Sequence, residues 1–261
     1  MKKMLDLIVT DNSQLNQSYC LLKLSTTNSS PLPEMFPGQF VEVHVTDSPT
    51  TFLRRPISVN FIDKEKNELW LLVQAIGDGT RRMATYKKGD LVNLLLPLGN
   101  SFTPPESSDK KDRVLLVGGG VGTAPMLYWG SILKEEGYSP VFLLGARSSK
   151  DLLQLDEFAK YGDVYTTTED GSHGEKGFVT NHSILELPDF KQIYTCGPKP
   201  MMMAIANYAH KHGITCEVSL ENTMACGFGV CLCCIENTTR GNVCVCTEGP
   251  VFNIKDLKWI N

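Results

Sequence analysis

Cysteine crowding near the C-terminus constrains this chain more than any other feature of its sequence. The 261 residues include nine cysteines, and seven of them lie between Cys216 and Cys246. In a reducing compartment such crowding favours metal binding over disulfides, and an odd number of cysteines does not fit a full disulfide set. The roughly 40 residues after position 220 are also too few to bury a large core of their own. A bound inorganic centre would explain how this segment folds.

The spacing of these cysteines is specific. The pattern C-x4-C-x2-C followed by a distant cysteine is the plant-type arrangement for a [2Fe–2S] cluster, and here it is formed by Cys226, Cys231, Cys234 and Cys246. Gly227 and Gly229 let the backbone fold around a cluster and direct its amides at sulfur. A zinc ribbon fits poorly, because the second cysteine pair, Cys244 and Cys246, has a single spacer residue. Spacing alone leaves Cys244 and Cys246 both open as the fourth ligand.

Composition excludes several classes of protein. The chain is 42% hydrophobic and 21% charged, which is ordinary for a globular protein and argues against disorder. The net charge of −4 argues against a nucleic-acid-binding protein, which needs a basic face. No run approaches the roughly 18 apolar residues of a membrane span. Asp6 and Asp11 interrupt any signal-peptide core, so we expect a cytoplasmic protein.

Up to about Gly99 the sequence consists of short apolar runs separated by turn residues. Residues 39–45 alternate with period two, as a half-buried strand does, and Pro37-Gly38 supplies a turn. Regular short strands with such turns predict a β-barrel or sandwich. The expected strands are 19–25, 39–45, 57–62, 68–74 and 90–96, with one short helix at 79–86. We predict that residues 1–102 form this β domain.

The pattern changes from residue 103. Residues 103–112 are rich in Pro, Ser and charge, which is typical of a linker. Beyond them apolar strands alternate with helical segments, and this alternation predicts an α/β domain with a doubly wound parallel sheet. The expected strands are 114–117, 141–144, 164–168, 192–195 and 215–220. One helix is expected to follow the glycine turn and to end near residue 136, and three others are expected at 152–161, 179–187 and 200–212. We predict an α/β domain at 103–220 and a small cluster domain at 221–261.

Two motifs of the α/β region are candidate nucleotide-binding elements. A strand is followed by a glycine turn and a helix start, where bare amides bind a pyrophosphate; the candidate residues are Gly118, Gly119, Gly120 and Gly122. Thr123 stands where a strict G-x-G-x-x-G has its last glycine, so the glycines could instead serve tight packing. At the end of another strand, Cys196 could contact a nicotinamide or flavin ring, or be a buried inert thiol.

Two motifs of the β region are candidate anion sites. Arg54-Arg55-Pro56-Ile57-Ser58 opens a strand, and a guanidinium beside a hydroxyl suits a phosphate or the edge of a flavin. By itself this motif could also be a charged strand start. The segment Gly77-Asp78-Gly79-Thr80 precedes the expected helix and is either a second phosphate cradle or a plain turn.

Taken in order, these motifs resemble the ferredoxin–NADP reductase superfamily. The cysteine pattern and the stretch 245–252, VCTEGPVF, narrow the resemblance to electron-transfer subunits of type B dihydroorotate dehydrogenases, over essentially the whole chain. The resemblance implies an FAD domain, an NAD domain and a [2Fe–2S] domain, and selects Cys246 over Cys244. The FAD motifs of the family carry over to Arg55, Pro56, Ile57, Ser58, Val73, Gln74, Ala75, Gly79 and Thr80. Many relatives have Arg where Gln74 stands, and the family's Cys-Gly-Pro carries over to Cys196 beside the nicotinamide.

The resemblance also implies a function. A flavin exchanges one or two electrons, so FAD must lie between a one-electron cluster and the two-electron carrier NAD. No carboxylate pair, serine triad or general base presents itself, so we expect no catalytic residue here. The implied partner is an FMN chain that oxidises dihydroorotate in pyrimidine biosynthesis, in a heterotetramer of two of each chain. NAD rather than NADP is implied only by the resemblance, since Arg147 could accept a 2′-phosphate.

Two other functions remain open from the residues. One is a related subunit that passes electrons between NAD(P)H and ferredoxin or a sulfur substrate, and the other is a zinc-stabilised nucleotide-binding regulator. Around the cysteines lie the apolar residues Met224, Phe228, Val230 and Leu232. A short segment cannot bury all of them, so we expect some to form an exposed patch that contacts a partner. The alternative is that they only shield the cluster from water.

Overall fold

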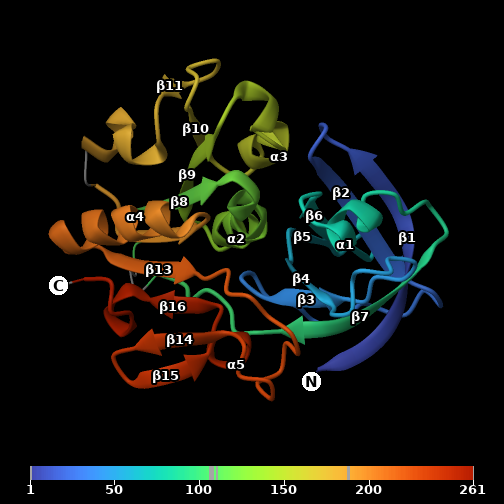
Figure 1. Ribbon diagram of the computed structural model, residues 1–261. Helices are drawn as coiled ribbons and strands as arrows, with labels where there is room; N and C mark the ends of the chain where they lie inside the picture. The colour runs from blue at the N-terminus through green and yellow to red at the C-terminus, as the bar shows by residue number, and fades with distance from the viewer. Residues whose placement is uncertain (1, 106–108, 110, 187–188, 261) are drawn as a thin grey trace. The chain divides into compact units, whose positions relative to one another are not determined.

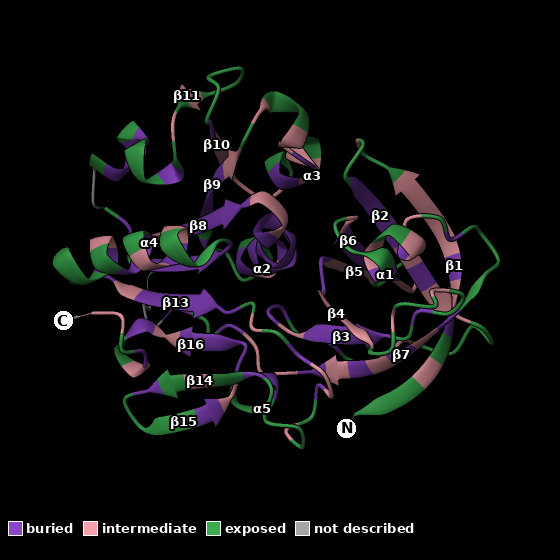
Figure 2. Ribbon diagram, in the orientation of Figure 1, coloured by how far each residue is buried: buried purple, intermediate pink, exposed green. Residues whose placement is uncertain are grey.

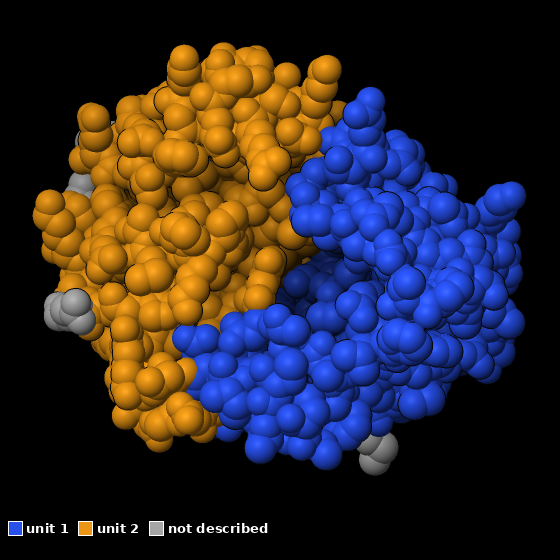
Figure 3. Space-filling view, viewed as in Figure 1, with its two compact units in different colours: residues 1–101, 222–236, 244–250 blue, residues 102–221, 237–243, 251–261 orange. Residues whose placement is uncertain are grey.

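The computed structural model describes residues 2–105, 109, 111–186 and 189–260 (Figure 1). The chain divides into two compact units (Figure 3). The first contains residues 1–101, 222–236 and 244–250, and the second contains residues 102–221, 237–243 and 251–261. Residues 222–261 therefore contribute to both units. Part of the expected linker, residues 106–108 and 110, lies outside the described residues.

The first unit is built on a curled antiparallel sheet of seven strands in the order β4-β3-β7-β1-β2-β6-β5. The strands are β1 (Lys3–Gln14), β2 (Tyr19–Thr26), β3 (Phe40–Val43), β4 (Arg55–Ser58), β5 (Phe61–Asp63), β6 (Glu68–Gln74) and β7 (Leu91–Leu98). Strand β7 shows why such sequences form strands: Val92, Leu94, Leu96 and Leu98 alternate with more exposed residues and are all buried. The expected β domain is confirmed, although strand β1 had not been predicted.

The expected single strand at 57–62 is wrong, because the chain changes partners in its middle. Val59 still donates its N–H to Gln39, beside β3, whereas Asn60 donates to Trp70 of β6. The apolar run is therefore shared by β4 and β5, which occupy the two ends of the strand order. This crossing gives the sheet its half-barrel curl. The expected short helix is α1 (Asp78–Met83).

The second unit contains a parallel sheet of seven strands in the order β11-β10-β9-β8-β12-β13-β16, in which only β16 runs antiparallel to its neighbour. The strands are β8 (Arg113–Gly119), β9 (Ser139–Ala146), β10 (Asp163–Thr168), β11 (Glu175–Lys176), β12 (Gln192–Cys196), β13 (Thr215–Ser219) and β16 (Val251–Asn253). The inner strands β8 and β12 are mostly apolar and almost entirely buried (Figure 2). The expected doubly wound sheet is confirmed.

Of the four helices expected in the second unit, three are confirmed and one is not. Helices α2 (Ala124–Glu135), α3 (Leu155–Ala159) and α4 (Lys199–Lys211) follow strands of the sheet. The expected helix at 179–187 is wrong up to residue 186, where the chain forms the 3₁₀ turns Val179–Asn181 and Ser183–Glu186; residue 187 lies outside the described residues. Between the turns His182 is extended, with ψ of 133°, so a helical hydrogen-bond ladder cannot continue.

The C-terminal segment has short elements where the sequence showed little periodicity. A hairpin of β14 (Ile235–Thr238) and β15 (Gly241–Cys244) leads into the short helix α5 (Val245–Glu248). Strand β16 then adds to the edge of the parallel sheet through β13. Between residues 222 and 234 no helix or strand is assigned. Among the described residues, no helix is long and apolar enough to span a bilayer.

Candidate cluster and cofactor sites

The four predicted ligand cysteines come together in two pairs, and all four belong to the first unit. Cys231 donates its backbone N–H to the sulfur of Cys226 at 3.5 Å. Cys246, in the first turn of α5, donates its N–H to the sulfur of Cys234 at 3.4 Å. Backbone N–H groups directed at cysteine sulfurs suit a cluster, because they stabilise the negative charge of thiolates. The donor set therefore fits a [2Fe–2S] cluster.

Cys226 and Cys246 differ in the pKa of their thiols. Burial raises the pKa of the Cys226 thiol, but N–H groups of Phe228, Cys231 and Val230 outweigh it and lower the pKa to about 6. Burial and the nearby Cys234 raise the pKa of Cys246 to about 12. Bound iron would remove both protons, since a coordinating thiol is deprotonated outright.

The described residues contain no group of three or more His, Cys, Asp or Glu side chains arranged for a single metal ion.

Cys246 and Cys244 have different surroundings, although both lie near Cys234. Cys246 is fully buried and also receives the N–H of Gly229, whereas Cys244 is partly exposed. A buried thiol that accepts a backbone N–H favours Cys246 as the fourth ligand, and this assignment stays a proposal. Cys233 is exposed, and the structure gives it no role.

Two glycines shape the cluster loop, by which we mean residues 224–234. Gly227 and Gly229 have φ of +73° and +88°, in the left-handed region. A Cβ on Gly227 would lie 2.7 Å from Cγ of Glu42, and a Cβ on Gly229 would lie 2.9 Å from Cγ2 of Thr247. Both glycines are needed for conformation and for space.

The expected FAD residues gather around strand β4 and helix α1. The four residues of β4, Arg55 to Ser58, are all half-buried. A Cβ on Gly79 would lie 3.0 Å from Cγ2 of Thr51 and 3.3 Å from Cγ of Arg55, so the structure brings the arginine motif and the glycine turn together. Gly77 is open on its Cβ side. A guanidinium beside a close-packed glycine turn fits an anionic group such as the pyrophosphate of FAD.

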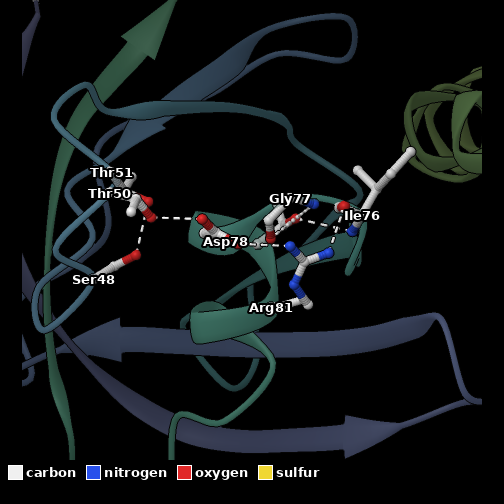
Figure 4. Close-up of polar contacts among 8 residues, drawn as sticks. Ser48, Thr50, Thr51, Ile76, Gly77, Asp78 and Arg81 are labelled. Carbon is white, nitrogen blue, oxygen red and sulfur yellow. Dashed lines mark hydrogen bonds and ion pairs between the residues drawn. The ribbon is translucent and has the colours of Figure 1, made fainter.

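Polar contacts hold the glycine turn in place (Figure 4). The Thr80 hydroxyl accepts the N–H groups of Ile76 at 3.1 Å and Gly77 at 3.0 Å. Asp78 would repel a phosphate, but its carboxylate accepts hydrogen bonds from the Thr50 hydroxyl at 2.5 Å and from Arg81 at 2.6 Å (Figure 4). The hydrogen bonds from Thr50 and Arg81 lower the pKa of Asp78.

The second expected flavin segment extends from the end of β6 into the turn that precedes α1. Val73 is fully buried, while Gln74 and Ala75 are half-buried. Gln74 lies opposite Tyr19 in the sheet, and Ala75 donates its N–H to Ser18 at 2.8 Å. Of the three, Gln74 and Ala75 keep accessible surface for a ligand, and Val73 contributes to the core.

The expected NAD residues lie at the point where the strand order of the parallel sheet reverses. Strands β8 and β12 are neighbours, and connections from them leave toward opposite edges of the sheet, which is the usual ligand-binding point of such folds. A Cβ on Gly122 would lie 2.5 Å from backbone atoms of Cys196 and Gly197. Gly120 has φ of +57°, and Gly118 and Gly119 complete the turn. The structure thus places the glycine turn against Cys-Gly-Pro, as a dinucleotide site requires.

Two acidic residues near these sites were missed by the sequence reasoning. Glu221 accepts a weak hydrogen bond from the buried thiol of Cys196, with 3.7 Å between sulfur and oxygen. Glu42 is fully buried in β3, and its carboxyl oxygens have no hydrogen-bond partner in the described part of the chain. The only signal for Glu42 was a charged residue in an otherwise apolar strand pattern, Phe40-Val-Glu-Val43.

Family models match two parts of the chain. The iron–sulfur cluster binding domain of dihydroorotate dehydrogenase B matches residues 221–258, and the oxidoreductase NAD-binding domain matches residues 116–207. These ranges contain the four cysteines and the glycine turn.

Solved structures confirm the fold. The structure of an NADH-dependent reduced ferredoxin–NADP oxidoreductase has a TM-score of 0.84 and 28% identity, and the match covers 98% of this chain and 90% of that one. An FAD/NAD-binding domain of nitric oxide dioxygenase from Vibrio cholerae has a TM-score of 0.67 at 20% identity, covering 82% of this chain and 97% of that one, and shows the fold alone. A reductase fold of this kind binds FAD, and FAD, NAD and an iron–sulfur cluster are the cofactors of this chain.

Curated relatives are more similar in sequence. A protein of Lysinibacillus sphaericus is 40% identical over 87% of this chain and 89% of its own length, and one of Bacillus cereus is 36% identical over 97% of both. Each is named as the electron transfer subunit of dihydroorotate dehydrogenase B (NAD⁺). By its motifs, its fold and these relatives, the chain belongs to the family of dihydroorotate dehydrogenase B electron transfer subunits.

Proposed function

We propose that this chain carries electrons between a partner chain, which holds FMN and oxidises dihydroorotate, and NAD⁺, with a [2Fe–2S] cluster and FAD as its own carriers. The observation that supports this best is the presence of three sites in one chain: the paired cysteines, the arginine and glycine motifs of the β unit, and the glycine turn of the parallel sheet. FAD exchanges two electrons with NAD⁺ and single electrons with a cluster. This pathway serves pyrimidine biosynthesis.

The residues of this chain bind and orient the cofactors and take no covalent part. Cys226, Cys231, Cys234 and Cys246 are the proposed cluster ligands. Arg55 and the turn at Gly79 and Thr80 hold the FAD pyrophosphate, with Pro56, Ile57, Ser58, Gln74 and Ala75 beside the flavin. Gly118 to Gly122 bind the pyrophosphate of NAD, and Cys196 lies beside the nicotinamide.

The cluster loop carries an apolar surface that supports a protein partner. Phe228, Val230 and Leu232 are 47%, 73% and 61% exposed, while Met224 is buried. Leu232 also has φ of +58°, which costs a leucine roughly 1–2 kcal/mol. A strained, exposed leucine beside a redox centre is best explained by contact with another chain. We propose that this surface binds the FMN chain, in an assembly of two of each chain.

Reconstitution tests the proposal. The purified chain should contain FAD and iron and oxidise NADH with an artificial acceptor, yet leave dihydroorotate unoxidised. Adding the FMN chain should produce dihydroorotate-dependent reduction of NAD⁺. Oxidation of dihydroorotate by this chain alone, free of any FMN protein, would overturn the proposal.

A second function is favoured by one observation, the match to a ferredoxin–NADP oxidoreductase at a TM-score of 0.84. In that case the chain would pass electrons between NAD(P)H and ferredoxin. The identity of 28% is lower than the 40% shared with the dihydroorotate dehydrogenase relative. Reduction of ferredoxin by NADH with no response to the FMN chain would favour this second function.

A further inference from the structure

Glu42 is a fully buried carboxyl group that the proposed ligand sets do not use. It lies in β3, opposite Pro56 of β4 and Leu95 of β7. Its side chain has no solvent exposure, and neither carboxyl oxygen has a hydrogen-bond partner in the described part of the chain. A buried polar group without a partner destabilises the fold, and more so if it is charged. Such a group therefore requires an explanation.

The surroundings of Glu42 join the two proposed redox sites of the first unit. On one side it packs against the cluster loop, where a Cβ on Gly227 would lie 2.7 Å from Cγ and 3.1 Å from Oε1 of Glu42. The backbone of Glu42 pairs with strand β4, and its main-chain carbonyl accepts a hydrogen bond from Arg54 at 3.3 Å. The Glu42 side chain thus packs against the loop of Cys226, and its backbone pairs with the strand of Arg55.

The charges that act on Glu42 come from these same two sites. Burial raises the pKa of the carboxyl group to about 7, Arg55 and Arg54 lower it, and Cys226 raises it. The guanidinium groups of Arg54 and Arg55 donate hydrogen bonds to carbonyls and to Asn93, not to the Glu42 carboxylate. A carboxylate held at this place acts through space, because little water is present to screen it.

We propose that Glu42 is a positioning residue for the cluster, and that its carboxylate is the fixed negative charge behind the cluster loop that lowers the reduction potential of the cluster. Reduction adds an electron to the cluster, and a nearby negative charge opposes that addition. This inference rests on the proposed function, since it requires the cluster on Cys226 and its partners. The proposal involves only the cluster bound by the cluster loop and requires no additional ligand.

The test is a redox titration of the purified holoprotein at alkaline pH, monitored through the EPR signal of the reduced cluster. Glu42→Gln keeps the shape and removes the charge. We expect it to raise the midpoint potential by an amount equal to about tenfold in the ratio of reduced to oxidised cluster, or ~59 mV for one electron. Glu65→Gln, which removes an exposed carboxylate in the turn between β5 and β6, should leave the potential unchanged.

Unchanged potential in Glu42→Gln, with iron content and flavin content equal to wild type, would overturn the inference and leave the proposed function intact. If Glu42→Gln does not retain the cluster, Glu42→Asp decides, because it keeps the charge but withdraws it from Gly227. A raised potential in Glu42→Asp supports the inference, and the wild-type potential overturns it. A wild-type chain that binds no cluster would instead overturn the proposed function.

Discussion

Two turns of this molecule are rich in glycine, but glycine is needed in each for a different physical reason. In the turn at 118–122, Gly122 is needed because backbone approaches backbone: its Cβ would lie 2.5 Å from main-chain atoms of Cys196 and Gly197. That turn joins a buried strand to a helix and is fixed on both sides. In the cluster loop, Gly227 and Gly229 are needed for their positive φ as well as for space, and the neighbours that an added Cβ would meet are side chains.

The difference shows what holds each turn in place. The first turn is stabilised by the sheet around it, which would form without a ligand. Residues 222–234 have no assigned helix or strand, and their apolar side chains at 228, 230 and 232 are exposed. Metal binding to such a loop contributes directly to its folding. We therefore expect cluster loss to disorder the second turn and ligand loss to spare the first.

The largest effect should come from removing a cluster ligand. Cys246→Ser places a poor iron ligand in a fully buried position and should abolish most of the bound iron. Cys244→Ser changes a partly exposed thiol at the residue just before α5, and the variant should retain its iron. Iron content and visible absorption measure both. If Cys244→Ser lost the cluster and Cys246→Ser kept it, the ligand assignment would be reversed.

The next effect should come from the first turn. Gly122→Ala forces a Cβ into the backbone of Cys196 and Gly197, which cannot move as a side chain would. We expect a loss of about 3 kcal/mol in the free energy of unfolding and weaker binding of NADH. Denaturant unfolding and an NADH titration measure these changes. Gly213→Ala, with nothing within 4 Å of the added Cβ, is the control and should cost about 1 kcal/mol through its φ of +68°. Equal losses in the two variants would contradict the backbone contact.

A smaller effect is expected in the cluster loop. Gly227→Ala adds strain at a φ of +73°, and its Cβ meets side-chain atoms, Cγ of Glu42 and Cδ1 of Leu98, rather than backbone. We expect about 2 kcal/mol of destabilisation, together with partial loss of iron. A loss as large as that of Gly122→Ala would mean that the loop is as rigidly packed as the first turn.

The smallest expected change in stability is a stabilisation, unlike the destabilisation expected for the two glycine variants. Leu232→Asn replaces a leucine at φ of +58° by a residue that tolerates this conformation, so the free energy of unfolding should rise by about 0.5–1 kcal/mol. The same change removes apolar surface and should weaken binding of the FMN chain about tenfold, ~1.4 kcal/mol. Calorimetry with that chain measures the affinity.

Val230→Asn is the matched control, since Val230 is exposed but is not among the described residues with positive φ. It should weaken binding without stabilising the chain. Unchanged affinity in both variants would show that this surface does not contact the partner.

Regular segments of this fold follow from local sequence, and irregular ones do not. The alternation of β7 and the continuous apolar run of β8 each predict one kind of strand, because burial on one or two faces leaves a visible period. The break between β4 and β5 leaves none, because Val59 and Asn60 change partners inside one apolar run. The 3₁₀ turns at 179–186 are separated by the extended His182, whose ring packs against Tyr165 and lies 3.5 Å from Glu175, contacts that no local pattern contains.

The candidate site shows the same division. Cysteine spacing and glycine turns are local signals, so the proposed ligand cysteines and the turn at 118–122 could be predicted from sequence. The position of Glu42 against Gly227 joins residues 185 positions apart, and no local pattern contains it. The approach of Gly79 to Arg55 is likewise a product of the folded sheet.

The most direct test of the account is an anaerobic titration of the purified chain with NADH, followed by visible absorption. If NAD, FAD and the cluster are connected within this chain, NADH should bleach the flavin and the cluster together, and in Cys246→Ser it should bleach the flavin alone. A wild-type chain whose flavin is reduced while its cluster stays oxidised, even after prolonged incubation with excess NADH, would contradict the proposed path of electrons.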